Sequence, residues 1–219
     1  MAYKGSFMEN VSVVVWDWNG TLLNDVDVNI ASINCLLARR GIPTIKDLVE
    51  YREGFGFPII DYYRTLGFDM ESENFSDIAD EYVRVYSEKL CETSLFPDVE
   101  AVLKHFREHG IRQVIVSAAE GERLRAEVKS FGISDYFTDI IGTGDNLGSS
   151  KILLGTNFVA GCGVTREEIV FIGDLLHDAE LAAACGCRAV LVAAGHQSAR
   201  RLAASGCDIL SDLGEILDK

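Results

Sequence analysis

The stretch VSVVVWDWNGTLL, residues 11–23, decides the fold of this chain. Its apolar run at 13–16 predicts a buried strand, which ends abruptly at Asp17. Open α/β sheets bind their ligands beyond the carboxyl ends of such strands. Gly20 permits a tight turn that brings backbone N–H groups close to an anion, and the Thr21 hydroxyl adds a further donor. An Asx turn that merely ends a strand explains the same residues equally well, so the rest of the chain must decide.

The composition is that of a folded chain with a strong excess of acidic residues. The 219 residues include 34 Asp and Glu against 20 Lys and Arg, which gives a formal net charge of −14. This length suffices for one sizeable core plus a small accessory domain. The charge argues against nucleic-acid and membrane partners, because both need basic patches. An anionic substrate is still compatible, provided that a metal and a lysine make its pocket locally positive.

The start of the chain and its cysteines indicate the compartment. Residues 1–10 are polar and mixed, and the apolar run after them is far too short to cross a bilayer, so we expect no secretory signal. The six cysteines form no CxxC pair and no metal-ligand spacing. We therefore expect six reduced, mostly buried thiols and a cytoplasmic protein.

Residues 24–92 predict helices and no strand. The expected helices run from a cap at Asn24 or Asp25 to Arg40, from a capping box at Thr44 to Arg52, from Pro58 to Leu66, and from Phe75 to Cys91. No Gly-, Ser- or Pro-rich tract marks this segment as a linker. It interrupts a chain that otherwise alternates strand and helix. We therefore predict a small all-helical cap over 24–92, inserted into a core that comprises 1–23 and 93–219.

Strands and helices alternate through the predicted core. After the first strand we expect strands at 112–117, 138–142, 168–173 and 188–192, and helices at 98–109, 120–131, 151–161, 177–185 and 198–205, with a loop at 144–149. This spacing is typical of βαβ units, whose strands run parallel. The predicted fold class is α/β, with a doubly wound, mostly parallel sheet and a Rossmann-like arrangement.

Polar and charged side chains lie at or just after the ends of the predicted strands. Asp17 follows the first strand, Ser117 ends the second, Lys151 opens the helix after the third, and Asp174 and Asp178 follow the fourth. In a doubly wound sheet these positions converge on one crevice. Three carboxylates there make an oxygen-rich site that suits Mg²⁺, while the serine, the backbone after it and the lysine can hold phosphate. Taken singly, each of these residues also has a purely structural explanation, as a helix cap, a loop hydroxyl or a solvent-exposed lysine.

With these motifs in this order, the chain resembles the haloacid dehalogenase (HAD) superfamily, and the place of its cap resembles the phosphoglycolate phosphatase-like branch. The resemblance implies that Asp17 is the nucleophile, which takes the phosphoryl group as an aspartyl-phosphate. The site residues that it implies are Asp17, Asn19 and Lys151 for catalysis, Gly20, Thr21, Ser117, Ala118 and Lys151 for phosphate, and Asp17, Asn19, Asp174 and Asp178 for the metal, which is Mg²⁺ in the family.

Asn19 departs from the family pattern Asp-x-Asp-Gly-Thr, which has Asp at this position. In the phosphatases that Asp binds Mg²⁺ through its backbone carbonyl, protonates the leaving oxygen and then deprotonates the attacking water. Asn keeps the first task and loses the other two. A general acid or base contributes typically ~10²–10⁴-fold to the rate, so we expect slow turnover unless another group substitutes. His177, beside the acidic fourth motif, and Asp25 are the only nearby candidates.

The predicted function is Mg²⁺-dependent hydrolysis of a small phosphorylated metabolite by a monomer or homodimer, with Arg52, Tyr62 and Arg64 of the cap as candidates for choosing the substrate. A catalytically weak phosphate-ligand sensor is the alternative that Asn19 itself favours. A dehalogenase on the same fold needs no metal. The presence of both Asp174 and Asp178, which suit a metal, therefore argues against a dehalogenase. A phosphonatase needs a cap lysine that forms a Schiff base, and the cap lysines are Lys46 and Lys89.

A dinucleotide-binding site is the remaining class that the motifs raise. The stretch GTGDNLG at 142–148 follows a predicted strand, but its third glycine comes one position late for the GxGxxG pattern. No acidic residue ends the next strand at the expected distance. We therefore set this class aside.

Overall fold

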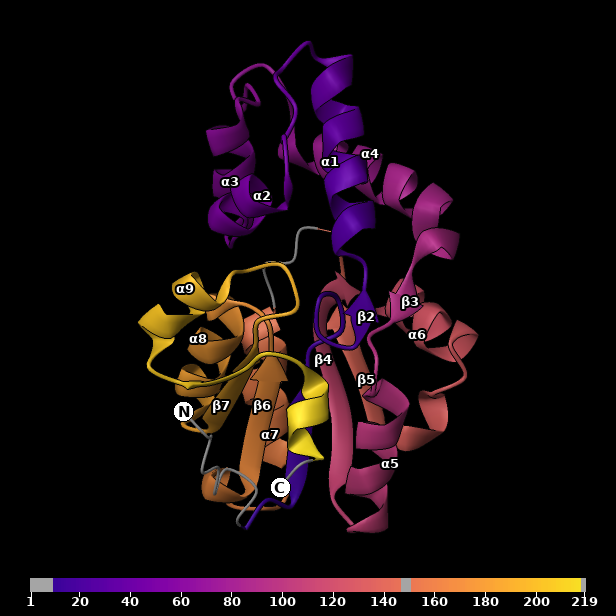
Figure 1. Cartoon of the computed structure of the whole chain (residues 1–219), viewed down its shortest axis with the longest axis vertical. Coiled ribbons are helices and arrows are strands. Elements are labelled where there is room, and N and C mark those ends of the chain that lie inside the picture. Colours follow the sequence, from indigo (N-terminus) through magenta and orange to yellow (C-terminus); the bar gives the residue numbers. More distant parts are fainter. Residues whose placement is uncertain (1–9, 147–150, 218–219) are drawn as a thin grey trace.

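A six-stranded parallel sheet forms the centre of the protein in the computed structural model, which describes residues 10–146 and 151–217. Its strands are β1 (Val13–Trp16), β4 (Arg112–Glu120), β5 (Asp139–Thr143), β6 (Ile169–Gly173), β7 (Arg188–Val192) and β8 (Asp208–Leu210). They lie in the order β5-β4-β1-β6-β7-β8 (Figure 1). The strand β1 pairs with β4 and β6, with Val15 opposite Val114 and Phe171. The predicted α/β class with a parallel sheet is confirmed.

Helices cover both faces of this sheet, which is why the apolar run of β1 is continuous. Alternate residues of a strand face opposite sides of a sheet. Val14 and Trp16 pack on the face covered by α5 (Val99–Glu108) and α6 (Gly121–Ser130), whereas Val13 and Val15 pack on the face covered by α7 (Lys151–Gly161) and α8 (Leu176–Cys185). A strand buried on both faces and paired at both edges leaves no position for a polar side chain until Asp17, at its carboxyl end.

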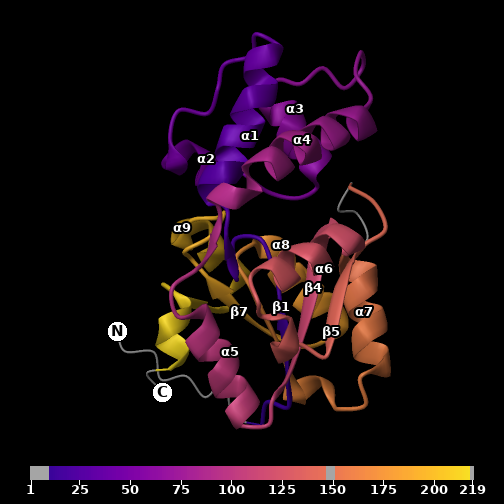
Figure 2. The same ribbon diagram turned by 90° about the vertical axis from the view of Figure 1, so that its right-hand side faces the viewer.

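Four helices form a separate layer beyond the carboxyl ends of the strands (Figures 1 and 2). They are α1 (Val26–Arg39), α2 (Leu48–Gly54), α3 (Ile59–Leu66) and α4 (Phe75–Lys89). Their buried residues, among them Ile33, Tyr51, Tyr63 and Ile78, form a hydrophobic cluster of their own, which Leu175 joins from the loop after β6. We refer to this helical layer as the cap.

The ends of most predicted elements are right to within a few residues, and the errors have local causes. The capping box predicted at Thr44 is wrong, because α2 begins after Asp47, whose side chain accepts a hydrogen bond from the Glu50 N–H at 2.8 Å. Three strands escaped prediction: β8, β2 (Leu23–Asn24) and β3 (Ser94–Leu95). With two or three residues each, they are too short for an alternating pattern to show. The predicted loop at 144–149 lies partly outside the described residues.

Two further expectations concern the membrane and the thiols. None of the helices formed by the described residues is long and apolar enough to cross a membrane. All six cysteines are free, as expected. The expectation that they are mostly buried is wrong, since only Cys185 is buried and Cys91 is exposed.

The predicted boundary between cap and core can be tested by limited proteolysis. The chain crosses between the layers twice, and the antiparallel pair β2 and β3 joins the two crossings. The crossing at Asp25 and Val26 is buried, whereas Glu92 and Ser94 are exposed at the other. We therefore expect a broad-specificity protease to cut first between cap and core near 92–94, and Mg²⁺ with a phosphate analogue to slow the cut. First cuts inside the strands of the parallel sheet would contradict the division.

Candidate active site

Three carboxylates meet at the carboxyl ends of neighbouring strands. Asp17 follows β1, Asp174 follows β6, and Asp178 lies in the first turn of α8. All three are buried, and each offers a ligand oxygen within 4.8 Å of the others. The parallel pairing of β1 and β6 brings the ends of these strands together, as the sequence predicts.

Lys151 lies in the middle of this acidic cluster. Its Nζ donates to Asp17 Oδ1 and to Asp178 Oδ1, both at 2.6 Å. The lysine is only 2% exposed, and burial by itself would lower its pKa most, but the two carboxylates outweigh that effect and raise it. A buried charge needs such partners, because desolvation of an unpaired ion is costly. Lys151 therefore stays protonated and orients Asp17.

One lysine does not compensate three buried acids. Burial, chiefly, and the neighbouring carboxylates raise the pKa of Asp17 to about 7 in spite of Lys151. Burial likewise raises the pKa of Asp174 to about 6. Both carboxyl groups would ionise more readily beside a cation, and an all-oxygen donor set is what Mg²⁺ prefers. Asp17 and Asp174 thus fit a magnesium ion by their chemistry, and the Asn19 carbonyl stays a predicted third ligand.

Asp178 supports the site in two visible ways. Its Oδ2 accepts hydrogen bonds from the backbone N–H groups of Asp174 at 3.1 Å and Leu175 at 3.0 Å, and its Oδ1 binds Lys151. A Cβ on Gly173 would lie 2.2 Å from this carboxylate, so the close approach requires glycine there. Asp178 therefore fixes the loop that carries Asp174, and its own contact with the metal remains a prediction.

The serine motif lies where the sequence places it. Ser117 is buried within β4, its Oγ accepts a hydrogen bond from the Ala119 N–H at 3.1 Å, and β4 continues three residues beyond it to Glu120. Ser117 and Ala118 both line the cavity that also contains Asp17 and Lys151. The structure thus brings the predicted phosphate-binding residues of this strand together with the predicted nucleophile.

Gly20 and Thr21 have other partners than the phosphate predicted for them. The Gly20 N–H donates to Asp25 Oδ1 at 3.0 Å, and the Thr21 hydroxyl donates to Asp174 Oδ1 at 3.1 Å. Gly20 has a φ of +73°, and a Cβ there would lie 2.4 Å from both Asp174 and His196. Neither residue is among those that line the cavity. We therefore correct this prediction: both groups position acidic side chains, because the anion beside the tight turn is a carboxylate of the chain itself.

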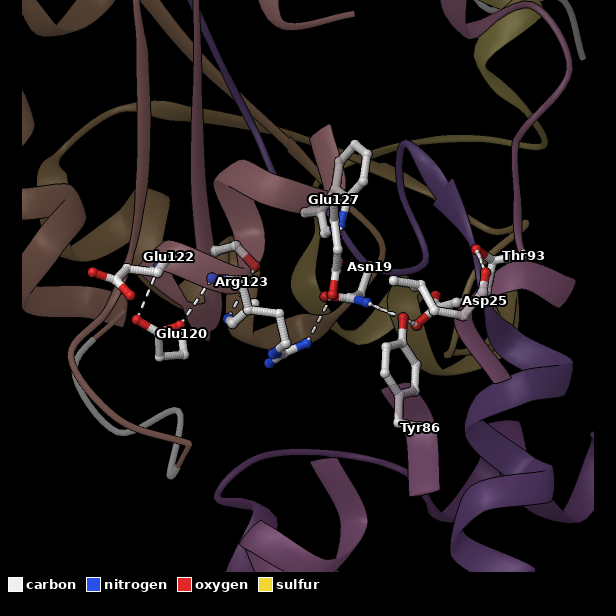
Figure 3. Close-up of polar contacts among 12 residues, drawn as sticks. Asn19, Asp25, Tyr86, Thr93, Glu120, Glu122, Arg123 and Glu127 are labelled. Atoms are coloured by element: carbon white, nitrogen blue, oxygen red, sulfur yellow. Dashed lines mark hydrogen bonds and ion pairs between the residues drawn. The ribbon is translucent and has the colours of Figure 1, made fainter. Parts of the chain in front are cut away.

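Asn19 is held by a buried carboxylate and by a tyrosine of the cap (Figure 3). Its amide nitrogen donates to Asp25 Oδ2 at 2.8 Å and to the Tyr86 hydroxyl at 3.0 Å, and that hydroxyl donates to the same Asp25 oxygen at 2.9 Å. Because a carboxylate only accepts hydrogen bonds, the amide nitrogen rather than the amide oxygen must face Asp25. Both N–H groups of Asn19 are therefore in use, and this side chain has no donor left for a substrate.

Asp25 is ionised and does not replace the missing acid. Burial is the largest single influence and would raise its pKa, but His196 and the hydrogen bonds from Asn19 and Tyr86 together lower it. His177, the other candidate, does not line the cavity: it contacts Glu180 at 3.2 Å and stacks on Phe57, which does line it. Asp25 thus has no proton to give, and His177 has no direct contact with the cavity.

His196 is a residue of the site that our sequence reasoning missed. It is 2% exposed in the loop after β7, and its backbone N–H donates to Asp174 Oδ2 at 2.6 Å. Its Nε2 lies 3.2 Å from Asp25 Oδ1, and its Nδ1 lies 2.8 Å from the Tyr51 hydroxyl of the cap. Burial alone would lower its pKa most, but Asp25 and the other carboxylates raise it to about 8. Its position beyond the carboxyl end of a parallel strand was the available signal.

A cavity of about 130 Å³ extends from the acidic cluster into the cap. The three cap residues proposed to choose the substrate are not among those that line it. Arg52 donates to the backbone carbonyl of Gly195 at 2.8 Å, Arg64 pairs with Asp61 on the surface, and Tyr62 is buried in the cap cluster. This correction has a simple reason: helical periodicity shows which residues share a face of a helix but not which face meets the core.

Solved structures with the same fold cover nearly the whole chain. A hydrolase of the haloacid dehalogenase-like family from Streptococcus pneumoniae superposes with a TM-score of 0.81, covering 96% of this chain and 99% of that protein at 19% identity. A predicted phosphoglycolate phosphatase from Haemophilus somnus gives a TM-score of 0.76, with 96% and 98% covered at 23% identity. At these identities the likeness shows the fold alone.

Sequence relatives extend the likeness beyond the fold. The phosphoglycolate phosphatase of Neisseria gonorrhoeae is 30% identical over 198 residues, which cover 86% of this chain and 83% of that protein. The phosphoglycolate phosphatase of Cereibacter sphaeroides is 28% identical over 192 residues, covering 85% and 87%. The sequence profile of haloacid dehalogenase-like hydrolases matches residues 14–192, a span that contains Asp17, Ser117, Lys151 and Asp174. The chain therefore belongs to the haloacid dehalogenase-like hydrolase family.

Proposed function

We propose that this hydrolase is a Mg²⁺-dependent phosphatase that acts on a small phosphorylated molecule through a phosphoryl group on Asp17. The observation that carries the proposal is the contact of Lys151 with both Asp17 and Asp178 at the buried end of a cavity. That contact holds one oxygen of Asp17 and leaves the other free to attack. A carboxylate oriented in this way serves as a nucleophile in other enzymes.

The residues of the chain would divide the reaction into two displacements. In the first, Asp17 forms a bond to phosphorus while the bond to the leaving oxygen breaks, and the electron pair goes to that oxygen. Ser117 and the backbone at Ala118 would hold phosphoryl oxygens, and Lys151 would offset their charge. In the second, water attacks phosphorus, which releases inorganic phosphate and restores the Asp17 carboxylate. Magnesium, held by Asp17 and Asp174, would supply positive charge against the phosphoryl oxygens.

Rival activities on the same fold receive less support. A phosphonatase needs a cap lysine that reaches the pocket, yet neither Lys46 nor Lys89 lines the cavity. A dehalogenase needs no cation, whereas three buried carboxylates within 4.8 Å of one another favour one. One specific observation supports the sensor alternative: both amide N–H groups of Asn19 are hydrogen-bonded, so Asn19 has no proton to give to a leaving group.

A screen for phosphate release separates the phosphatase from the sensor. The protein would be incubated with a panel of phosphomonoesters, with and without Mg²⁺, while inorganic phosphate is measured. We expect release that depends on the cation. Tight binding of a phosphorylated compound, measured by calorimetry, without release of phosphate from any member of the panel would favour the sensor and overturn the proposal.

Exchange of the side chains at 19 and 25 tests the missing proton transfer. In Asn19→Asp alone the new carboxylate would face that of Asp25 across a contact that is now a 2.8 Å hydrogen bond, so one of the two must hold a proton. In Asn19→Asp with Asp25→Asn, the amide and the carboxylate change places with size and net charge conserved. We expect the double variant to raise kcat on alkyl phosphates by ~10²-fold over wild type.

Two controls accompany the exchange. Asp25→Asn alone changes the same neighbour without adding an acid at position 19, so we expect no gain from it. The single Asn19→Asp variant should gain less than the double variant, because its acid is coupled to Asp25. Equal rates for wild type and the double variant on alkyl phosphates would show that another residue already carries the proton.

A further inference from the structure

The substrate class follows from the cavity, if the phosphatase function proposed above is correct. We propose that the protein hydrolyses aryl phosphomonoesters, in which phosphate is attached to a phenolic oxygen on a single ring that bears a hydrogen-bonding substituent. Three features of the described residues support this class. They are the engagement of the possible proton donors with Asp25, the aromatic wall of the cavity, and buried polar atoms of that wall without hydrogen-bond partners.

The first feature concerns the groups that could protonate a leaving oxygen. The amide N–H groups of Asn19 are bound to Asp25 and Tyr86, and the Tyr86 hydroxyl donates to Asp25. His196 Nδ1 lies 2.8 Å from the Tyr51 hydroxyl, while its Nε2 lies 3.2 Å from Asp25 Oδ1, an ion-pair distance without hydrogen-bond geometry. Asn19 and Tyr86 are therefore committed to Asp25 by hydrogen bonds, and the His196 ring is held beside the same carboxylate as its ionic partner.

The remaining polar side chains on the cavity wall are poor acids. Lys151 lies between two carboxylates, and the guanidinium of Arg123 does not give up its proton in proteins. The hydroxyls of Tyr63 and Tyr82 are phenols, which are weaker acids than a carboxylic acid by about six pKa units. Among the described residues that line the cavity, the His196 imidazole is thus the one possible acid of ordinary strength, and Asp25, 3.2 Å from its Nε2, holds it as an ionic partner.

The leaving group must then depart without much protonation. A phenol has a pKa of about 10, whereas an aliphatic alcohol resembles water, whose pKa is about 16. A phenolate is the more stable product by several powers of ten. In the first displacement the electron pair of the broken P–O bond would go to the phenolic oxygen, which takes a proton from solvent after it leaves.

The second feature is the wall of the cavity. Its cap side carries Phe55, Phe57, Tyr63, Tyr82 and Tyr86, with aliphatic residues between them. Aromatic side chains bind another ring by offset stacking or edge-to-face contact. With the phosphoryl group at the acidic cluster, the lining on the cap side thus suits an aromatic ring better than a short, fully charged acid.

The third feature is a set of polar atoms buried in the same wall. Asn29 Oδ1, on α1, and Arg123 Nε, on α6, are buried without a hydrogen-bond partner, as is His196 Nε2 beside Asp25, and all three residues line the cavity. The other end of Arg123 is engaged, since Nη1 pairs with Glu127 at 3.1 Å and Glu127 accepts from Trp18 Nε1 at 2.8 Å (Figure 3). A buried polar atom left unpaired is costly. A ring hydroxyl would satisfy Asn29 as a donor or Arg123 as an acceptor.

Matched substrates test the two parts of this proposal separately. Phenyl phosphate and benzyl phosphate carry the same ring but differ in the leaving oxygen, phenolic in one and alkyl in the other. We expect phenyl phosphate to exceed benzyl phosphate in kcat/KM, which reports the first displacement, by at least ~10²-fold, the typical contribution of a missing acid. Hydroxyphenyl phosphates should have a KM ~10-fold lower than phenyl phosphate, and Asn29→Ala should remove that difference.

The outcomes distinguish this proposal from the phosphatase function on which it rests. Release of phosphate from no compound would overturn both. Hydrolysis of benzyl phosphate or 2-phosphoglycolate as fast as phenyl phosphate would confirm a phosphatase and overturn the aryl class. A lower KM for hydroxyphenyl phosphates that survives Asn29→Ala and Arg123→Lys would overturn the assignment of these two residues.

Discussion

Replacing Asp17 with Asn is expected to lower kcat/KM on phenyl phosphate by roughly 10⁴-fold or more, since loss of a nucleophile in other enzymes costs up to about 10⁶-fold. The amide nitrogen is not a nucleophile, so no phosphoryl group can be transferred to residue 17. The fold should persist, because Lys151 keeps its contact with Asp178 at 2.6 Å. Steady-state kinetics and thermal unfolding measure the two effects separately.

Asp17→Glu is the matched variant for charge. It preserves the carboxylate that Lys151 binds but displaces it by one methylene, and a misplacement of about 1 Å can cost ~10²-fold in rate. We expect Asp17→Glu to lose most of its kcat/KM as well. Asp61→Asn, which changes an exposed carboxylate, is the control and should keep the activity of wild type. Substantial activity in Asp17→Asn with an intact fold would mean that another residue takes the phosphoryl group.

Removal of divalent cations is expected to have the second large effect. EDTA should abolish hydrolysis and Mg²⁺ should restore it, because three carboxylates with oxygens within 4.8 Å of one another repel each other and an incoming phosphate. Binding to the folded state should also be visible without substrate. At 100 times its dissociation constant, Mg²⁺ would stabilise the fold by about 2.7 kcal/mol, which calorimetry detects as a higher unfolding temperature.

Asp174→Asn should lose both responses to Mg²⁺. Its fold should remain, since the His196 N–H can bind the amide oxygen in place of Oδ2, and the Thr21 hydroxyl, which accepts as well as donates, can face the amide nitrogen in place of Oδ1. Asp77→Asn, at an exposed carboxylate of the cap, is the control that should respond like wild type. Full activity in EDTA would contradict the metal site and favour a dehalogenase, which release of halide from a 2-haloacid would reveal.

The parallel sheet and the place of its acidic cluster were predictable because both depend on local patterns. A continuous apolar run in β1 requires cover on both faces, and the polar residue that ends the run must lie at the carboxyl edge. Asp17 and Asp174 follow strands, Lys151 opens a helix, and Ser117 lies near the carboxyl end of a strand, and the sequence shows the type of each of these elements. Parallel pairing then brings them together without further information.

The contacts between cap and core were not predictable in the same way. Tyr51 and Tyr86 lie on cap helices, and their hydroxyls meet His196 and Asp25 only because the cap lies over the strand ends. Their spacing along a helix is that of ordinary core residues, so nothing local marks them. The same holds for Asn29 and Arg123, whose unpaired buried atoms become visible only once side-chain surroundings are known.

Gly20 shows how a correct local prediction can give a wrong role. The sequence correctly indicates a tight turn that brings an N–H close to an anion, and in the structure Gly20 has a φ of +73°. The anion is the Asp25 carboxylate, five residues on, rather than a phosphate. A side chain close in sequence competes with any ligand for such a donor at a small entropic cost.

Time-resolved mixing with 4-nitrophenyl phosphate and Mg²⁺ tests most directly the claim that Asp17 carries the phosphoryl group and that Asn19 cannot activate water. The first displacement should be fast, since 4-nitrophenolate leaves without a proton, and the second slow. We predict a burst of 4-nitrophenol close to one equivalent per active site, a slower steady state, and a phosphoryl group on Asp17 in acid-quenched samples analysed by mass spectrometry. Linear product formation from the first turnover, or a phosphoryl group on a different residue, would contradict this mechanism.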